Sequence, residues 1–260
     1  MEYKIKPSSR KLTYLENELI PEHMPKVPCR LLITAPSGSG KTQLMGSLLR
    51  DEIYGYKDVF KGNIFVMSST FSLKDPAWDD VNIKQENIWD DYREDIIEEL
   101  IEDQENIIKD RGGKDKGVPH ILLILDDLIT QIPQSRQSSL VKLFVSGRHR
   151  LISIWMTTQS YKHCPKAIRL NTTGQIVFKV NNIERQAMAE ENQVDSNLFL
   201  NLYEIATEEP YSFLYINNEK PIKERYYKNF EELLSITNKL TKQKEPNDRE
   251  NKRETKKSLE

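Results

Sequence analysis

The sequence predicts an α/β fold, a three-layer sandwich in which a mostly parallel central sheet lies between two layers of helices. Two observations predict this class. Apolar runs rich in Ile, Leu and Val alternate with segments whose apolar residues recur at helical spacing, the pattern of repeated strand–helix units. The run Ile121–Leu125 contains no polar residue, as expected of a strand that is buried on both faces.

The predicted elements follow one another in a regular order. Runs of β-favouring apolar residues predict strands at 31–35, 62–69, 121–125, 152–158, 175–180 and 211–216. Helical spacing or helix-forming composition predicts helices at 43–50, 91–109, 134–147, 183–192 and 195–205. Residues 71–90, in which tryptophans stand in polar surroundings, are predicted to form a loop.

The length of 260 residues is sufficient for one large domain with a sizeable core. We divide the chain into a polar N-terminal extension at 1–28, an α/β domain at 29–238 and a tail at 239–260. The tail is almost entirely charged and polar, so we expect it to be disordered.

The most informative segment of the chain is LLITAPSGSGKT at residues 31–42. A buried strand, a loop of small residues and a helix follow one another there, which is the context of a phosphate-binding P-loop. Ala35 stands where glycine is commoner, but the other residues and both flanking elements agree with the motif. The predicted nucleotide-binding residues are Ala35, Pro36, Ser37, Gly38, Ser39, Gly40, Lys41 and Thr42.

Each residue type in this loop has a physical reason. Backbone N–H groups form an anion-binding nest at the start of a helix, and Gly38 and Gly40 let the backbone approach phosphate oxygens. Lys41 can reach the β- and γ-phosphates as a point charge, and the Thr42 hydroxyl can ligate Mg²⁺. The predicted cofactors are therefore a nucleoside triphosphate and Mg²⁺.

Two acidic residues end the strongest apolar strand. Asp126 and Asp127 occupy the Walker B position of a P-loop fold. Asp126 is predicted to hold Mg²⁺, and Asp127 to orient and deprotonate the attacking water. The simpler alternative is a pair of acids that only caps the loop after a strand.

Polar and basic residues surround the next predicted strand. Gln159 follows this strand and suits a sensor of the γ-phosphate or the water, because its amide both donates and accepts hydrogen bonds. Arg148 and Arg150 precede the strand and are candidates for neutralising charge on the transferring phosphoryl group, in the same subunit or in a neighbour. Bonds from Gln159 to the loop backbone, and pairing of either arginine with surface carboxylates, are the structural alternatives.

Composition limits the class of protein. The formal net charge of −2 means that any nucleic acid must bind a local basic patch or a surface built by oligomerisation. Cys29 and Cys164 have no metal-type spacing and are expected to be reduced. No apolar run is long enough to span a bilayer and the N-terminus has no apolar signal core, so we expect a soluble intracellular protein without stable membrane insertion.

The motifs together resemble a known family. The blocks are LILDD at 123–127, FVSGRHRLIS at 144–153, TTQSY at 157–161 and AIRLN at 167–171. This combination resembles the DNA-packaging ATPases of large double-stranded DNA viruses and virophages, the poxvirus-like branch of the FtsK–HerA superfamily. The resemblance covers roughly residues 28 to 217.

The resemblance implies more than the residues alone. It implies a P-loop NTPase fold of the RecA/ASCE type, with an additional strand between the Walker A and Walker B strands. It implies an ATP-driven translocase that packages viral double-stranded DNA into preformed capsids as a ring, with a hexamer expected. Capsid or internal-membrane components are then the implied partners, and the host cytoplasm at viral assembly sites, or the virion, the implied location.

The site residues carry over one by one. In the resemblance, Lys41 and Thr42 match the Walker A pair, and Asp126 and Asp127 match the Walker B pair. Gln159 matches the polar sensor. Further matches are Arg148 as the arginine finger, Arg150 as its competitor and Arg169 as a residue facing the neighbouring subunit. Asp127 departs from the Glu that is typical of cellular translocases, which leaves the assignment of the base more open.

Three alternatives are retained. One is a cellular-type FtsK/HerA translocase or helicase, another is a P-loop kinase of small molecules, and the third is a binding module that has lost hydrolysis. For DNA contact, the sequence offers the basic loop 111–116, the segment 161–163 and the mixed-charge tail.

Overall fold

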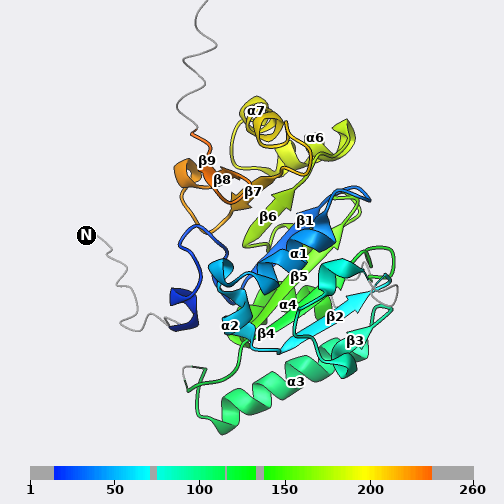
Figure 1. Cartoon of the computed structure of the whole chain (residues 1–260), viewed down its shortest axis with the longest axis vertical. Coiled ribbons are helices and arrows are strands. Elements are labelled where there is room, and N and C mark those ends of the chain that lie inside the picture. Colours follow the sequence, from blue (N-terminus) through cyan, green and yellow to red (C-terminus); the bar gives the residue numbers. More distant parts are fainter. Residues whose placement is uncertain (1–14, 71–74, 115, 133–137, 236–260) are drawn as a thin grey trace, which may run out of the picture.

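The computed structural model describes residues 15–70, 75–114, 116–132 and 138–235 (Figure 1). The disorder expected of the tail 239–260, the first part of the extension 1–28 and the start of the helix expected at 134–147 lie outside the described residues.

The described residues form a nine-stranded sheet in the order β3-β2-β4-β5-β1-β6-β7-β8-β9. Its strands are β1 (Arg30–Thr34), β2 (Ile64–Ser68), β3 (Ile88–Trp89), β4 (Ile121–Asp126), β5 (Ile152–Thr158), β6 (Gly174–Val177), β7 (Leu214–Asn217), β8 (Tyr226–Lys228) and β9 (Glu232–Leu233). The pairings from β3 to β6 are parallel, and β7, β8 and β9 are added antiparallel at one edge.

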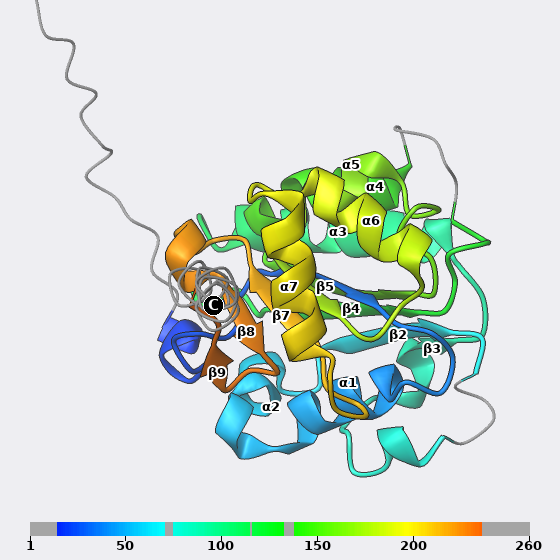
Figure 2. The same ribbon diagram turned by 90° about the horizontal axis from the view of Figure 1, so that it is seen from above.

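Helices cover both faces of the sheet, as Figure 2 shows. On one face lie α1 (Lys41–Arg50) and α2 (Tyr56–Phe60). On the other face lie α3 (Glu94–Asp110), α4 (Ser139–Ser146), α5 (Lys166–Arg169), α6 (Asn182–Glu191) and α7 (Ser196–Ala206). Single 3₁₀ turns occur at Leu15–Glu18, Glu52–Tyr54, Pro76–Trp78, Gln85–Asn87, Gly147–His149 and Ile222–Glu224. The predicted three-layer α/β class is therefore confirmed.

The position of β5 carries the most information about the fold. It lies between β1 and β4 and is hydrogen-bonded to both, so the strand that the family resemblance places between the Walker A and Walker B strands is present. Because these three strands are parallel, their carboxyl ends meet at one edge of the sheet.

The core consists of two apolar layers separated by the sheet. Residues that alternate along a strand point to opposite faces, and both faces here are buried. On β4, Leu122 and Ile124 join the cluster under α1 and α2, while Leu123 and Leu125 join the cluster under α3 and α4. This explains why the sequence of β4 is apolar throughout.

Three strands differ from expectation, and the short helices α2 and α5 were not predicted either. The segment predicted as a loop at 71–90 contains the two-residue strand β3, whose Trp89 ring is stacked on Phe65 of β2 at 6.4 Å between centroids. The strands β8 and β9 were not predicted. All three are too short for a periodic pattern, and pairing with a neighbouring strand defines them.

The described part of the N-terminal extension packs on the domain. Ile20, Met24 and Val27 are buried in the same cluster as the inner face of α1. Cys29 and Cys164 are free and buried, and burial raises the pKa of the Cys29 thiol to about 11. Among the described helices, none combines the length and the hydropathy needed to cross a bilayer.

Candidate nucleotide-binding and hydrolysis site

The P-loop starts where β1 ends. The Ala35 N–H donates to the carbonyl of Thr158 at 3.0 Å, so the first loop residue still continues the sheet pairing with β5. The Ala35 side chain is fully buried in the cluster beneath α1. A methyl group therefore has a place in the core at this position, which explains why the loop accepts alanine where glycine is commoner.

The two loop glycines are required by backbone conformation. Gly38 and Gly40 have φ angles of 75° and 88°, in the left-handed region that L side chains rarely adopt. A Cβ on Gly38 would meet no atom within 4 Å, so conformation rather than crowding favours glycine there. Gly40 caps α1 without a side-chain hydrogen bond, and the first N–H groups of the helix are thus left for an anion.

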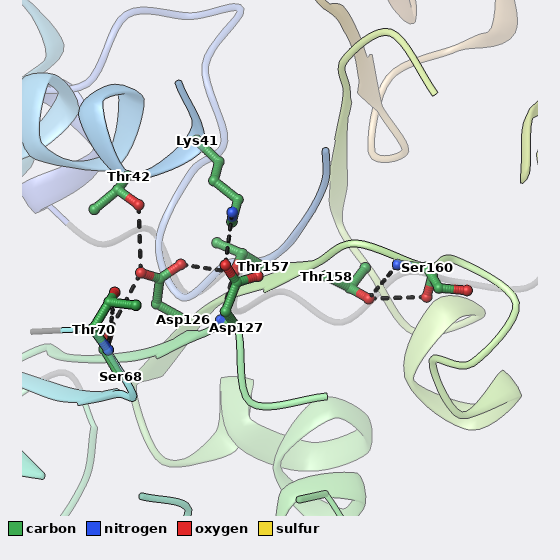
Figure 3. A network of polar contacts seen from close by, with 9 residues as sticks. All are labelled: Lys41, Thr42, Ser68, Thr70, Asp126, Asp127, Thr157, Thr158 and Ser160. Atoms are coloured by element: carbon green, nitrogen blue, oxygen red, sulfur yellow. Dashed lines mark hydrogen bonds and ion pairs between the residues drawn. The ribbon is translucent and has the colours of Figure 1, made fainter. Parts of the chain in front are cut away.

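The carboxylate of Asp126 is the centre of a polar network at the carboxyl edge of the sheet (Figure 3). Its Oδ1 accepts a hydrogen bond from the Thr157 hydroxyl at 2.8 Å. Its Oδ2 accepts from the hydroxyls of Ser68 at 3.3 Å and Thr42 at 3.4 Å. Burial raises the pKa of Asp126, the Thr157 bond opposes this, and the charge of Asp127 raises it further.

This network fits a divalent cation. The Thr42 hydroxyl and the Asp126 carboxylate are hard oxygen ligands, and they lie close enough to share one Mg²⁺ ion. A cation there would also offset the cost of burying the Asp126 charge, which raises its pKa in the absence of a cation.

Asp127 owes its direction to a backbone turn. Successive side chains of a strand point to opposite faces, so two adjacent acids would normally diverge. Asp127 has a φ of 55°, a left-handed conformation, and its N–H donates to the Thr157 hydroxyl at 2.9 Å. This turn brings its Oδ2 to 2.7 Å from the Nζ of Lys41, in an ion pair that is largely buried.

The other carboxylate oxygen of Asp127, Oδ1, is available to accept a hydrogen bond. Its Oδ1 is buried and has no hydrogen-bond partner within the described ranges. A buried acceptor without a partner is costly, and such atoms occur where a ligand or water is to be bound. A general base needs this kind of acceptor.

Three hydroxyl residues of the site were not predicted. Ser68 ends β2 and Thr157 lies on β5. Thr70 lies two residues after Ser68, and the hydroxyls of Ser68 and Thr70 are 3.2 Å apart. Each stands where a strand next to β4 ends, so sheet order decides their role. The sequence signal is a hydroxyl residue that closes an apolar strand, as in the Ser-Ser-Thr and Thr-Thr-Gln segments.

Thr157→Val tests the role of the hydrogen-bond network around Asp126. The change removes the hydroxyl that donates to the Asp126 carboxylate and accepts from the Asp127 N–H. It costs about 1–3 kcal/mol of unfolding free energy, because it leaves buried polar groups unpaired. The Mg²⁺ concentration for half-maximal hydrolysis should rise as well. Ser153→Ala is the control on the same strand, since its hydroxyl accepts from the Cys29 N–H at the other end of β5. Urea unfolding and Mg²⁺ titration of activity measure the two effects, and an unchanged Mg²⁺ requirement in Thr157→Val would contradict the assignment.

The predicted sensor lies at the same edge. Gln159 directly follows β5, and its neighbour Thr158 is tied to Ala35 of the P-loop. The Thr158 hydroxyl donates to the Ser160 carbonyl at 2.9 Å and accepts from the Ser160 N–H at 3.1 Å, which fixes the turn that carries Gln159. The Gln159 side chain itself is exposed.

Arg148 and Arg150 lie beside the amino ends of the parallel strands, on the opposite side of the sheet from the P-loop. Both precede the amino end of β5, whereas the P-loop lies at its carboxyl end. The seven residues of β5 separate the two edges by about 20 Å. The Arg150 guanidinium donates to Glu105 at 2.6 Å and to Ser146 at 2.7 Å, while Arg148 is exposed. Neither arginine can therefore reach the P-loop of its own subunit.

Arg169 is held within its own subunit. Its Nη1 lies 2.8 Å from Glu191 on α6, and its guanidinium lies over the Tyr161 ring at 4.8 Å from the centroid. The Tyr161 hydroxyl donates to the same carboxylate at 3.0 Å. These contacts anchor α5 to α6, and the expectation that Arg169 faces a neighbouring subunit stays a prediction.

Comparison with known proteins places this geometry in a family. The family model described as Poxvirus A32 protein matches residues 16–218. The chain belongs to this family. This result confirms the resemblance on which the sequence interpretation was based, and the match includes both acids and the entire P-loop.

Two curated viral proteins are similar to this chain in sequence. The DNA packaging protein OPG160 of Variola virus is 29% identical over 175 residues, which cover 64% of this chain and 59% of the relative. The protein of the same name from Vaccinia virus strain Copenhagen gives the same identity and coverage. The chain thus spans less than two thirds of these relatives.

The fold is shared with a solved viral protein. The genome packaging NTPase B204 from Sulfolobus turreted icosahedral virus 2, in complex with AMP, aligns with a TM-score of 0.52 at 14% identity. The alignment covers 75% of this chain and 98% of B204. At this identity the similarity concerns the fold.

Proposed function

We propose that this chain is an ATPase that moves viral double-stranded DNA into a preformed capsid. The observation that carries the proposal is the meeting of Lys41, Thr42, Asp126 and Asp127 at one sheet edge. These residues supply the phosphate, metal and base positions of a hydrolytic P-loop site. The name of the Variola virus and Vaccinia virus relatives, DNA packaging protein, supports the use of that hydrolysis.

In the proposed reaction, Lys41 first exchanges its ion-pair partner. Lys41 leaves Asp127 and contacts the β- and γ-phosphates, which bring more negative charge than one carboxylate. Thr42 and Asp126 would hold Mg²⁺, and the bound ion would supply positive charge to the phosphate oxygens. Asp127, now released, accepts a proton from the water that attacks the γ-phosphorus. The bond to the β-phosphate oxygen breaks, and ADP and phosphate leave.

The surface near the amino end of β5, opposite the P-loop, is proposed to contact a neighbouring subunit and DNA. A cavity of about 380 Å³ there is lined by the cationic residues Lys26, Arg30, Lys114 and Arg148, together with His149 and Glu219. A chain of net charge −2 thus concentrates positive charge locally. In a ring, Arg148 or Arg150 would reach a neighbour's nucleotide, and Lys114, from the loop 111–116, would contact DNA phosphates.

The remaining parts of the proposal concern assembly. Residues 29–238 form the ATPase domain, and identical subunits form a ring around the DNA, with six expected. Capsid or internal-membrane components dock the ring at viral assembly sites in the host cytoplasm or in the virion. Gln159, at the edge that carries the P-loop, senses the γ-phosphate.

Double-stranded DNA should stimulate ATP hydrolysis at low salt, and the stimulation should fall as salt rises, because phosphate contacts release counterions. Lys114→Glu should weaken this stimulation and leave basal hydrolysis intact. Lys84→Glu, an equal charge change at an exposed lysine elsewhere, is the control. Steady-state phosphate release measures both.

Two results would contradict the proposal. The absence of DNA stimulation would argue against a translocase. Transfer of the γ-phosphate to a nucleoside instead of water would indicate the small-molecule kinase that the sequence left open.

A further inference from the structure

The turn between α7 and β7 reaches the P-loop, and Figure 2 shows this loop beside α1. At its tip, Tyr211 has a φ of 64° and a side chain that is 74% exposed. A Cβ placed on Gly40 would lie 3.5 Å from Cδ1 of this tyrosine. An exposed aromatic ring therefore stands directly over the loop that would hold the phosphates.

A cavity opens next to this ring. It has a volume of about 460 Å³, and its apolar lining combines Tyr211 with Leu44, Ile53, Tyr54, Phe213 and Phe230. Leu44 belongs to the first turns of α1, and its N–H donates to the Gly40 carbonyl at 2.9 Å. The cavity thus starts one helical turn from the phosphate-binding residues.

Exposure of the lining is unusual for apolar side chains. Ile53 is 72% exposed and Tyr211 is 74% exposed, yet both line the same cavity. Apolar surface that remains uncovered next to a binding loop is typical of a ligand site. Asn229 lines the cavity as well, and its side chain is fixed because its Oδ1 accepts from the Phe213 N–H at 3.2 Å.

We propose that this cavity binds the base of the nucleotide, with a purine ring stacked on Tyr211 and flanked by Ile53 and Leu44. The inference rests on the proposed function, because it takes the P-loop as the phosphate site. The phosphates then fix one end of the ligand, and the base extends along α1 into the cavity. A flat aromatic heterocycle matches a lining of aromatic rings and aliphatic side chains, and Asn229 offers the base edge a hydrogen-bonding group.

The test compares two ligands on the full-length protein, ATP and inorganic tripolyphosphate, with Mg²⁺ and isothermal titration calorimetry. Tyr211→Ala should weaken ATP binding about tenfold, as expected for the loss of one base–aromatic stacking contact. Tripolyphosphate has no base, so its affinity should not change. Tyr211→Phe keeps the ring and should bind ATP like the natural chain.

A second variant in the cavity and a control variant outside it check the result. Ile53→Ala should also weaken ATP binding selectively, while Ile183→Ala, which removes an apolar side chain that is 65% exposed on α6, should change neither affinity. Equal weakening of both ligands in Tyr211→Ala would show that the tyrosine only supports the P-loop, and unchanged ATP affinity would exclude the stack. Either result overturns the inference.

The outcome is separable from the proposed function. If DNA fails to stimulate hydrolysis but Tyr211→Ala still discriminates between the two ligands, the base site stands and the translocase does not. If the natural chain binds neither ligand, the nucleotide site itself is wrong.

Discussion

Lys41→Ala is expected to abolish ATP hydrolysis and to weaken nucleotide binding strongly. Lys41 Nζ is the cation that the structure places against the acid pair, in a side chain that is only 7% exposed. Its removal takes away the charge that contacts the β- and γ-phosphates, and it leaves two adjacent carboxylates with less compensation. Loss of a single positioned donor of this kind reduces turnover by about 10²–10³-fold.

Phosphate release and nucleotide titration measure this effect. Lys57→Ala is a matched control, because Lys57 is half exposed and its Nζ pairs with Glu52 at 3.5 Å, outside the P-loop. Lys41→Arg should also be inactive, since a planar guanidinium cannot replace a compact ammonium in this tight site. Hydrolysis by Lys41→Ala at the natural rate would show that the P-loop assignment is incorrect.

Asp127→Asn should lower turnover, as Lys41→Ala does, but unlike Lys41→Ala it should not weaken ATP binding. Asparagine tolerates the left-handed backbone at this position, so the turn is retained. The amide cannot accept a proton from water, and the loss of a general base costs about 10²–10⁴-fold in rate. Because Lys41 no longer has to leave an ion pair, ATP should bind at least as tightly as in the natural chain.

Single-turnover hydrolysis and equilibrium binding separate the two quantities. Asp80→Asn is the control, since Asp80 is an exposed aspartate that also has a positive φ, of 63°. Weaker ATP binding in Asp127→Asn would mean that the ion pair does not compete with the nucleotide. Unchanged turnover would assign the base to another residue.

The sequence predicted the parts of the site that are contiguous in the chain. The P-loop and the acid pair are local motifs in which strand, loop and helix signals coincide, and the structure brings Lys41, Thr42, Asp126 and Asp127 together. The apolar composition of β4 likewise predicted a strand with two buried faces.

The remaining parts depend on information that is spread over the sheet. Ser68 and Thr157 bond Asp126 because β2 and β5 flank β4, and this order cannot be deduced from spacing. The Lys41–Asp127 pair depends on one left-handed residue, which no sequence pattern marks. The arginines were recognised by their motif, but only the direction of β5 shows that they lie about 20 Å from the P-loop of the same subunit.

The pairing of β1 has a consequence for how the protein folds during synthesis. In the described sheet β1 lies between β5 and β6, and the bond from the Cys29 N–H to the Ser153 hydroxyl spans 124 positions of the chain. β1 therefore lacks one of its two neighbouring strands until β6 has been synthesised, although the P-loop residues are made early. Such non-local pairing slows folding, because a long loop must close first. We expect a nascent chain that ends before Gly174 to bind no ATP, whatever the state of its Walker motifs.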